Sequence, residues 1–234
     1  MGGRLPDRLK NWFHEEQKKL EGKTGRQKAQ YILEYYWIEI LAAAAALSFL
    51  VFFVYRMNFV PHENWFYGIF ANTASVSTDT SALGSDFAAY AGYDLKEKNL
   101  VLNAASWFAP SKPGGTNNSY FQAFAAVTEA GDLDVVTMGR EDLEALGSSG
   151  RLLDLNDESC LEIRKRYEDR FVYCIPYDET YSTDPVPVGI DISDSLLVKK
   201  YHFYEDDCVL GIGAYSKHMD SILAFLELIT GEMS

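Results

Sequence analysis

The feature that most constrains this chain is a continuous apolar run over residues 36–55, YWIEILAAAAALSFLVFFVY. Its twenty residues include one charged side chain, Glu39. As a helix they span about 30 Å, the thickness of the hydrocarbon core of a bilayer. Tyr36, Trp37 and Tyr55 stand at the two ends, as aromatic rings do at membrane interfaces. We therefore predict a transmembrane helix over residues 36–57.

A cleaved signal peptide and a buried core helix are the alternatives to an anchor. More than thirty residues precede the run, and Arg56 follows it in place of the small residues of a cleavage site. A core helix is rarely apolar on all sides for twenty residues. Glu39 lies about one turn inside the boundary, where its carboxylate can reach the interface. An uncleaved anchor is the better interpretation.

The charges on the two sides of this run differ in sign. Residues 1–33 carry eight Lys or Arg and four acidic residues, whereas residues 58–234 carry twelve Lys or Arg and 28 acidic residues. Because Lys and Arg concentrate on the cytoplasmic side, we predict a cytoplasmic segment at 1–35 and an extracellular domain at 58–234 in the cell membrane. A domain this acidic repels phosphates, so we expect no nucleic-acid partner.

The cytoplasmic segment has two predicted helices. Apolar residues at near-helical spacing predict an amphipathic helix on the inner leaflet; they are Leu5, Leu9, Trp12, Phe13 and Leu20. Thr24 and Gln27 have the spacing of a capping box, so a second helix is predicted to begin there and enter the membrane. An orientation signal is the preferred interpretation of this segment, with a docking site for a cytoplasmic partner as the alternative.

The outer domain alternates strand and helix patterns. Strands are predicted at residues 66–71, 99–105, 133–138, 171–175, 186–192 and 209–214, and helices at 81–93, 118–130, 139–147 and 217–229. Strand–helix–strand units of this length produce parallel strands joined by right-handed crossovers. The predicted fold class is therefore α/β: one transmembrane helix followed by a three-layer domain with a mostly parallel sheet.

Three pieces of the outer domain follow one another in a known order. Residues 132–157, DLDVVTMGREDLEALGSSGRLLDLND, contain an Asp-Val-Val strand, a short helix, a small-residue turn and a Gly-x-Leu-x-Asp-Leu stretch. Residues 172–178 (VYCIPYD) match a strand before a hinge, and residues 210–218 (LGIGAYSKH) match a return strand and turn. In this order the chain resembles the extracellular solute-binding proteins of ABC importers, of the oligosaccharide-binding type.

The resemblance also has a departure. Those proteins have two lobes around a ligand cleft, but thirty residues separate Asp178 from Val209, where a second lobe of a hundred or more is expected. The resemblance therefore implies a single lobe on a membrane anchor, in a bacterial envelope. It implies a recognition or accessory module for a small solute, a sugar or a peptide. The alternative is a non-catalytic scaffold that pairs with another membrane protein through the face of the missing lobe.

Ligands of open parallel sheets sit beyond the carboxyl ends of the strands. This position selects the residues after the first three strands as candidate ligand-binding residues; they are Asn72, Thr73, Ser106, Trp107, Gly139 and Arg140. Trp107 could stack on a sugar and Arg140 could pair with a ligand carboxylate. The alternative is that Trp107 fills the edge of the core and Arg140 caps a surface ion pair.

The remaining chemistry is sparse. A Cys160–Cys174 disulfide suits an oxidising exterior and leaves Cys208 free, whereas the apolar strand around Cys174 favours a buried thiol. Neither the cysteines nor the four histidines have zinc-site spacing, so no metal or cofactor is expected. The sequence has no nucleophile elbow, P-loop or His-Glu-x-x-His motif, so we do not expect an enzyme.

Overall fold

A computed structural model describes residues 14–15, 17–19, 21–59, 63–75 and 78–231. The chain divides into two compact units, Met1–Val60 and Pro61–Ser234. Most of the predicted amphipathic helix, with Leu5, Leu9, Trp12, Phe13 and Leu20, lies outside the described residues.

The first unit contains the predicted capping box. Helix α2 (Gly25–Tyr35) follows Thr24, whose backbone N–H donates to Oε1 of Gln27 at 3.0 Å. The helix is interrupted at Tyr36, and α3 (Trp37–Phe59) begins at the next residue. The predicted start of a helix at Thr24 is confirmed, but this helix ends before the apolar run, which forms the separate helix α3.

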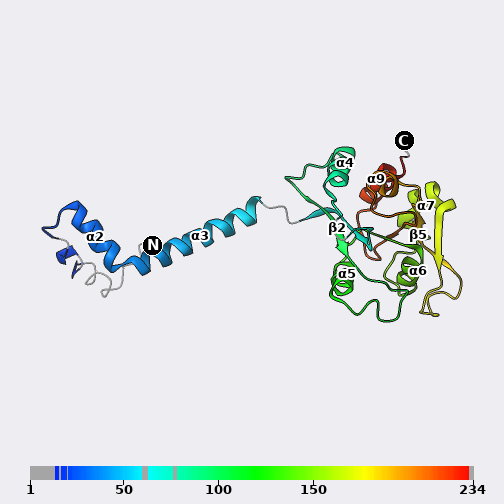
Figure 1. Cartoon of the computed structure of the whole chain (residues 1–234), viewed down its shortest axis with the longest axis horizontal. Helices are drawn as coiled ribbons and strands as arrows, with labels where there is room; N and C mark the ends of the chain where they lie inside the picture. The colour runs from blue at the N-terminus through cyan, green and yellow to red at the C-terminus, as the bar shows by residue number, and fades with distance from the viewer. Residues whose placement is uncertain (1–13, 16, 20, 60–62, 76–77, 232–234) are drawn as a thin grey trace. The chain divides into compact units, whose positions relative to one another are not determined.

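Helix α3 carries the apolar run (Figure 1). Its stretch Trp37–Met57 is the one helix of the described residues that is long and apolar enough to cross a membrane, and all of its side chains are exposed in the protein. Burying a Leu or Phe side chain is worth about 1.5–3 kcal/mol. An uncovered helix of this length and composition is therefore suited to the apolar interior of a bilayer.

The second unit is an α/β domain around a six-stranded sheet. The strands are β1 (Asn64–Ala71), β2 (Asn99–Ser106), β3 (Val135–Met138), β4 (Phe171–Cys174), β5 (Val186–Asp191) and β6 (Val209–Ile212). The longer helices are α4 (Ser81–Ala91), α5 (Ser119–Ala130), α6 (Arg140–Ser148), α7 (Leu161–Tyr167) and α9 (Met219–Thr230). Short helical segments are α8 (Leu196–Lys199), η1 (Glu158–Cys160) and η2 (Glu168–Arg170).

The sheet is mixed, with the order β2-β1-β3-β6-β5-β4. The pairs β1–β2 and β1–β3 are parallel, as predicted from the crossovers. The pairs β3–β6, β6–β5 and β5–β4 are antiparallel, so the prediction of a mostly parallel sheet holds only for the first half. The connections account for two of these pairs: β4 and β5 are joined without a helix, and only the four-residue α8 lies between β5 and β6, so neither connection has a full crossover helix that would return the chain in the same direction.

Helices cover both faces of the sheet and make three layers (Figure 1). Successive residues of β1 point to opposite faces: Phe66 and Phe70 join the core under α4, α7, α8 and α9, and Ile69 and Ala71 join the core under α5 and α6. The first core is aromatic, with the rings of Phe66 and Phe87 5.0 Å apart in an edge-to-face pair. Such pairs add about 0.5–1.5 kcal/mol to the area they bury.

Helix α6 lies unusually close to the sheet. A Cβ on Gly189 of β5 would stand 2.4 Å from Cδ2 of Leu143, and a Cβ on Gly147 of α6 would stand 2.6 Å from Cγ2 of Val188. Glycine at both positions therefore lets helix and strand approach. This approach fixes the C-terminal end of α6 beside the start of β5.

Candidate functional site

The six predicted ligand-binding residues do gather at one edge of the sheet, where β1, β2 and β3 end. The backbone N–H of Asn72 donates to the carbonyl of Ser106 at 2.9 Å, and the side-chain amide of Asn72 donates to Asp142 of α6 at 3.3 Å. The sequence thus identified a real convergence of loops. Their polar groups, however, are largely bonded to one another.

Asn72 and Thr73 hold the loops in place. The Asn72 amide donates to the carbonyl of Phe108 at 2.7 Å and accepts from its N–H at 3.1 Å. Asn72 adopts a left-handed backbone with φ of 57°, a conformation that asparagine tolerates better than most residues. The hydroxyl of Thr73 is buried and donates to the carbonyl of Ser75 at 3.0 Å. Both side chains are therefore engaged within the protein.

The crevice between β1 and β3, where the chain order reverses, is filled by Tyr204. Its hydroxyl lies 3.0 Å from the carbonyl oxygen of Ala71 and 2.8 Å from that of Thr137. Burial raises the pKa of Tyr204 well above its ordinary value, so the hydroxyl stays a donor. The crevice between β1 and β3 is the position at which open parallel sheets bind ligands. No local pattern in the sequence marks Tyr204, because it reaches the crevice from a loop 67 residues after Thr137.

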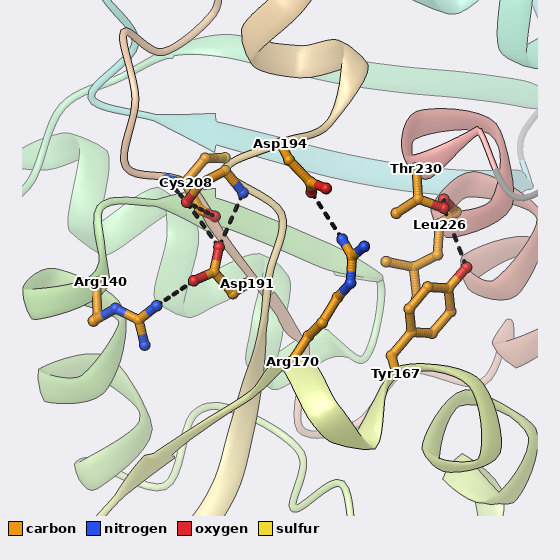
Figure 2. Close-up of polar contacts among 9 residues, drawn as sticks. Arg140, Tyr167, Arg170, Asp191, Asp194, Cys208, Leu226 and Thr230 are labelled. Carbon is orange, nitrogen blue, oxygen red and sulfur yellow. Dashed lines mark hydrogen bonds and ion pairs between the residues drawn. The ribbon is translucent and has the colours of Figure 1, made fainter.

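Gly139 precedes α6 and Arg140 begins it. The N–H and guanidinium groups of Arg140 that could bind an anion are already bonded to carboxylates of the chain. The Arg140 N–H donates to Oδ2 of Asp207 at 2.7 Å, so a carboxylate of the chain occupies the positive end of the helix. The Arg140 guanidinium pairs with Asp191 (Figure 2). Asp191 also accepts a hydrogen bond from the Ser193 hydroxyl. Burial raises the pKa of Asp191, but the bonds from Ser193 and the charge of Arg140 outweigh it and lower the pKa. The surface ion pair, given above as the alternative, is what the structure shows.

Trp107 matches neither prediction fully. Its side chain is half-buried, and its carbonyl accepts from the amide of Asn118 at 3.1 Å. Its buried Nε1–H has no hydrogen-bond partner among the described residues. The ring is therefore neither a free stacking platform nor a fully satisfied core residue.

The structure does not contain the possible Cys160–Cys174 disulfide. Both residues are buried free thiols, and they lie in different cores on opposite faces of the sheet. Cys208 is also a buried free thiol. Burial raises the pKa of all three thiols, so they stay protonated and unreactive at neutral pH. The buried-thiol interpretation of Cys174 is confirmed.

No group of three or more His, Cys, Asp or Glu among the described residues could hold a metal ion.

The opposite edge of the sheet holds a cavity that the sequence analysis did not find. Its volume is about 710 Å³, within the range of small-molecule sites. We name it the tyrosine–aspartate cavity. Its lining residues are Gly147, Ser149, Gly150, Leu152, Leu153, Asp154, Asn156, Asp157, Pro176, Tyr177, Asp178, Tyr181, Val186, Val188 and Ala214. They come from the end of α6, the stretch after it, the β4–β5 connection, the start of β5 and the segment after β6.

Three carboxylates and two phenol rings give this cavity its chemistry. Oδ2 of Asp154 accepts from the hydroxyl of Tyr181 at 3.0 Å. Oδ1 of Asp157 accepts from the Ser159 hydroxyl at 2.7 Å, and Oδ1 of Asp178 accepts from the Thr180 hydroxyl at 2.6 Å. These side-chain bonds, helped by backbone bonds, lower the pKa of both carboxyls, which are therefore ionised at neutral pH.

The aromatic rings of the cavity face solvent. Tyr177 is 72 % exposed and Tyr181 is 62 % exposed. The N–H of Tyr177 donates to the carbonyl of Ser148 at 2.8 Å, which ties the connection to the end of α6. A signal for this site was present in the sequence: residues 176–184, PYDETYSTD, combine two tyrosines with acids and turn residues. The resemblance places only the first three of these residues, Pro176 to Asp178, at the end of a strand before a hinge.

A second cavity of about 570 Å³ adjoins the first and shares Tyr177. We name it the glutamate cavity. Its lining residues are Pro110, Ser111, Glu141, Glu144, Ala145, Ser148, Tyr173, Cys174, Ile175, Tyr177 and Pro185. It places two carboxylates of α6 beside β4, the strand at the end of the sheet.

Comparison of the chain with protein-family models, with curated proteins and with solved structures finds no match.

Proposed function

We propose that the chain is a single-pass membrane protein whose N-terminal segment lies in the cytoplasm and whose second unit is an extracellular recognition module. The exposed apolar helix Trp37–Met57 supports the membrane anchor. The basic flank before this helix and the acidic domain after it support the orientation. The proposal is for binding rather than catalysis.

The recognition role is related to that of solute-binding proteins of ABC importers. Two features support it: the resemblance described above, and the position of its return strand as β6, which inserts antiparallel between β3 and β5. The observation that carries the proposal is the tyrosine–aspartate cavity, because exposed tyrosines beside ionised carboxylates can hold a sugar or a peptide. The strand-end residues, already bonded within the chain, are assigned to structure.

A thermal-shift screen of the full chain in nonionic detergent tests the proposal, with sugars, peptides and amino acids as ligands. A ligand at a hundred times its dissociation constant adds about 2.7 kcal/mol of stability. For a domain of this size the melting temperature should rise by about 5–10 °C. Tyr181→Ala should abolish the rise, and Tyr120→Ala, which removes an exposed tyrosine of α5, should leave it unchanged. A flat response from folded protein would refute the recognition role.

The second candidate is a scaffold that pairs with another membrane protein. It is favoured by the apolar side chains exposed along and after β4: Tyr173 at 48 %, Ile175 at 61 % and Tyr177 at 72 %. Adjoining exposed apolar side chains of this kind mark interaction sites. Crosslinking in native membranes from Ile175→Cys tests this role. A discrete crosslinked species supports it, and a monomer under all conditions argues against it.

A further inference from the structure

The tyrosine–aspartate cavity and the glutamate cavity form neighbouring halves of one surface. Tyr177 lines both, and the chain from Tyr173 through Ile175 to Tyr177 contributes to their walls. An elongated ligand can therefore occupy both cavities, whereas a monosaccharide would fill only one.

The charge of this surface has one sign. Asp154, Asp157 and Asp178 line the first cavity, and Glu141 and Glu144 line the second. No Lys, Arg or His is among the residues that line either cavity. Arg164, whose guanidinium donates to the backbone carbonyls of Asn156 and Asp157, offsets part of this charge, and the excess of carboxylates attracts cations and repels anions.

The aromatic side chains suit the same kind of ligand. The rings of Tyr173, Tyr177 and Tyr181 are 48 %, 72 % and 62 % exposed. Exposed tyrosine faces attract ammonium and guanidinium groups and also cover apolar side chains. A ligand with both cationic and apolar groups therefore fits better than a neutral sugar.

Strand β4 provides a backbone edge. It pairs with β5 on one side, stands at the end of the sheet order, and pairs with no other described strand. Such an edge can bind an extended peptide, whose side chains alternate between the two faces. A second copy of this chain is a poor occupant, because residues 58–234 carry sixteen more acidic than basic residues and copies repel.

We infer that the two cavities and the edge of β4 together bind an extended peptide with Lys or Arg at alternate positions and apolar residues between them. This inference rests on the proposed recognition function and narrows its ligand to a cationic peptide segment. Residues two apart in an extended chain are about 6.5–7 Å apart, which lets one peptide reach carboxylates in both cavities.

Fluorescence anisotropy with the full chain in nonionic detergent tests the inference. The probe is a labelled, end-capped hexapeptide Lys-Val-Lys-Tyr-Lys-Val, and its matched control is Glu-Val-Glu-Tyr-Glu-Val. We expect the basic peptide to bind and the acidic peptide not to bind. Raising the salt from 0.05 to 0.5 M should weaken binding at least about tenfold, because salt screens exposed charges.

Charge-neutral variants assign the binding to the two cavities. Asp178→Asn and Glu144→Gln should each weaken binding about threefold, the scale of one exposed ion pair. Glu129→Gln, which removes the same charge from an exposed position of α5, should have no effect. Circular dichroism verifies that each variant is folded. Equal binding by all variants would overturn the inference.

The outcomes separate the inference from the proposed function. A neutral oligosaccharide that stabilises the chain through Tyr181, together with no binding of the basic peptide, would overturn the inference and keep the recognition role. Failure of every ligand class would overturn both. Salt-sensitive peptide binding that Asp178→Asn and Glu144→Gln weaken supports both.

Discussion

Replacing Tyr204 with Phe removes one hydroxyl from the crevice between β1 and β3 and leaves the ring in place. That hydroxyl lies 3.0 Å from the carbonyl oxygen of Ala71 and 2.8 Å from that of Thr137, and the residue is 7 % exposed. The hydroxyl has one hydrogen to donate between these two carbonyls, so the substitution removes a hydrogen bond to a buried acceptor. An unsatisfied buried group costs about 1–3 kcal/mol, and we expect Tyr204→Phe to reduce the free energy of unfolding by about 2 kcal/mol.

Urea unfolding of the full chain in detergent, followed by near-ultraviolet circular dichroism, measures this loss. In a thermal scan the same loss should lower the melting temperature by about 4–8 °C. Tyr215→Phe is the control, because Tyr215 is 60 % exposed and the loss of its hydroxyl should change the free energy of unfolding by less than about 0.5 kcal/mol. Binding at the tyrosine–aspartate cavity should be the same in Tyr204→Phe as in the wild type. An unchanged stability, or a lost ligand response, would refute the structural role of Tyr204.

Three further predictions concern packing, pH and topology. Gly189→Ala should destabilise the domain by about 1–3 kcal/mol, because its Cβ would stand 2.4 Å from Leu143; urea midpoints measure this. Burial raises the pKa of Asp134 above 3.8, so the folded state binds its proton more tightly than the unfolded state does. The stability of the wild type relative to Asp134→Asn should therefore fall as the pH rises from 3.8 through the raised pKa of the folded state. Unfolding measured at several pH values would show this fall. In intact cells, an impermeant maleimide should label Ala89→Cys and not Glu21→Cys.

Each of these predictions has a result that contradicts it. Gly84→Ala makes the same chemical change where the closest atom is 3.5 Å away, so a loss equal to that of Gly189→Ala would contradict the packing argument. A relative stability that rises with pH would show that Ser216, Tyr67 and His218 outweigh the burial of Asp134. Labelling of Glu21→Cys in intact cells would reverse the orientation.

Local patterns were sufficient for the individual elements. The apolar run became α3, the Thr24–Gln27 spacing became the start of α2, and all six predicted strands formed. These signals are readable because hydrophobic period and cap chemistry act over a few residues. Two short helices, α7 and α8, were missed, since one or two turns leave too little periodicity to distinguish them from loops.

Strand direction and the position of the tyrosine–aspartate cavity depended on contacts distant in sequence. β6 joins β3 across about seventy residues, and Tyr204 reaches the crevice from a loop of its own. The tyrosine–aspartate cavity is assembled from the end of α6, the β4–β5 connection and Ala214. The strand-end residues looked available in the sequence because their partners, such as Asp191 and Asp207 for Arg140, cannot be found from spacing.

The amino-acid sequence alone is therefore sufficient for the long apolar helix, the charge asymmetry of its flanks and the α/β alternation, because each follows from composition or from periodicity within one segment. Only the tertiary structure shows which edge of the sheet is filled and which is open. That difference depends on which distant side chains satisfy the polar groups of each loop, and hydrogen bonds of this kind form only when the strands have been brought into register.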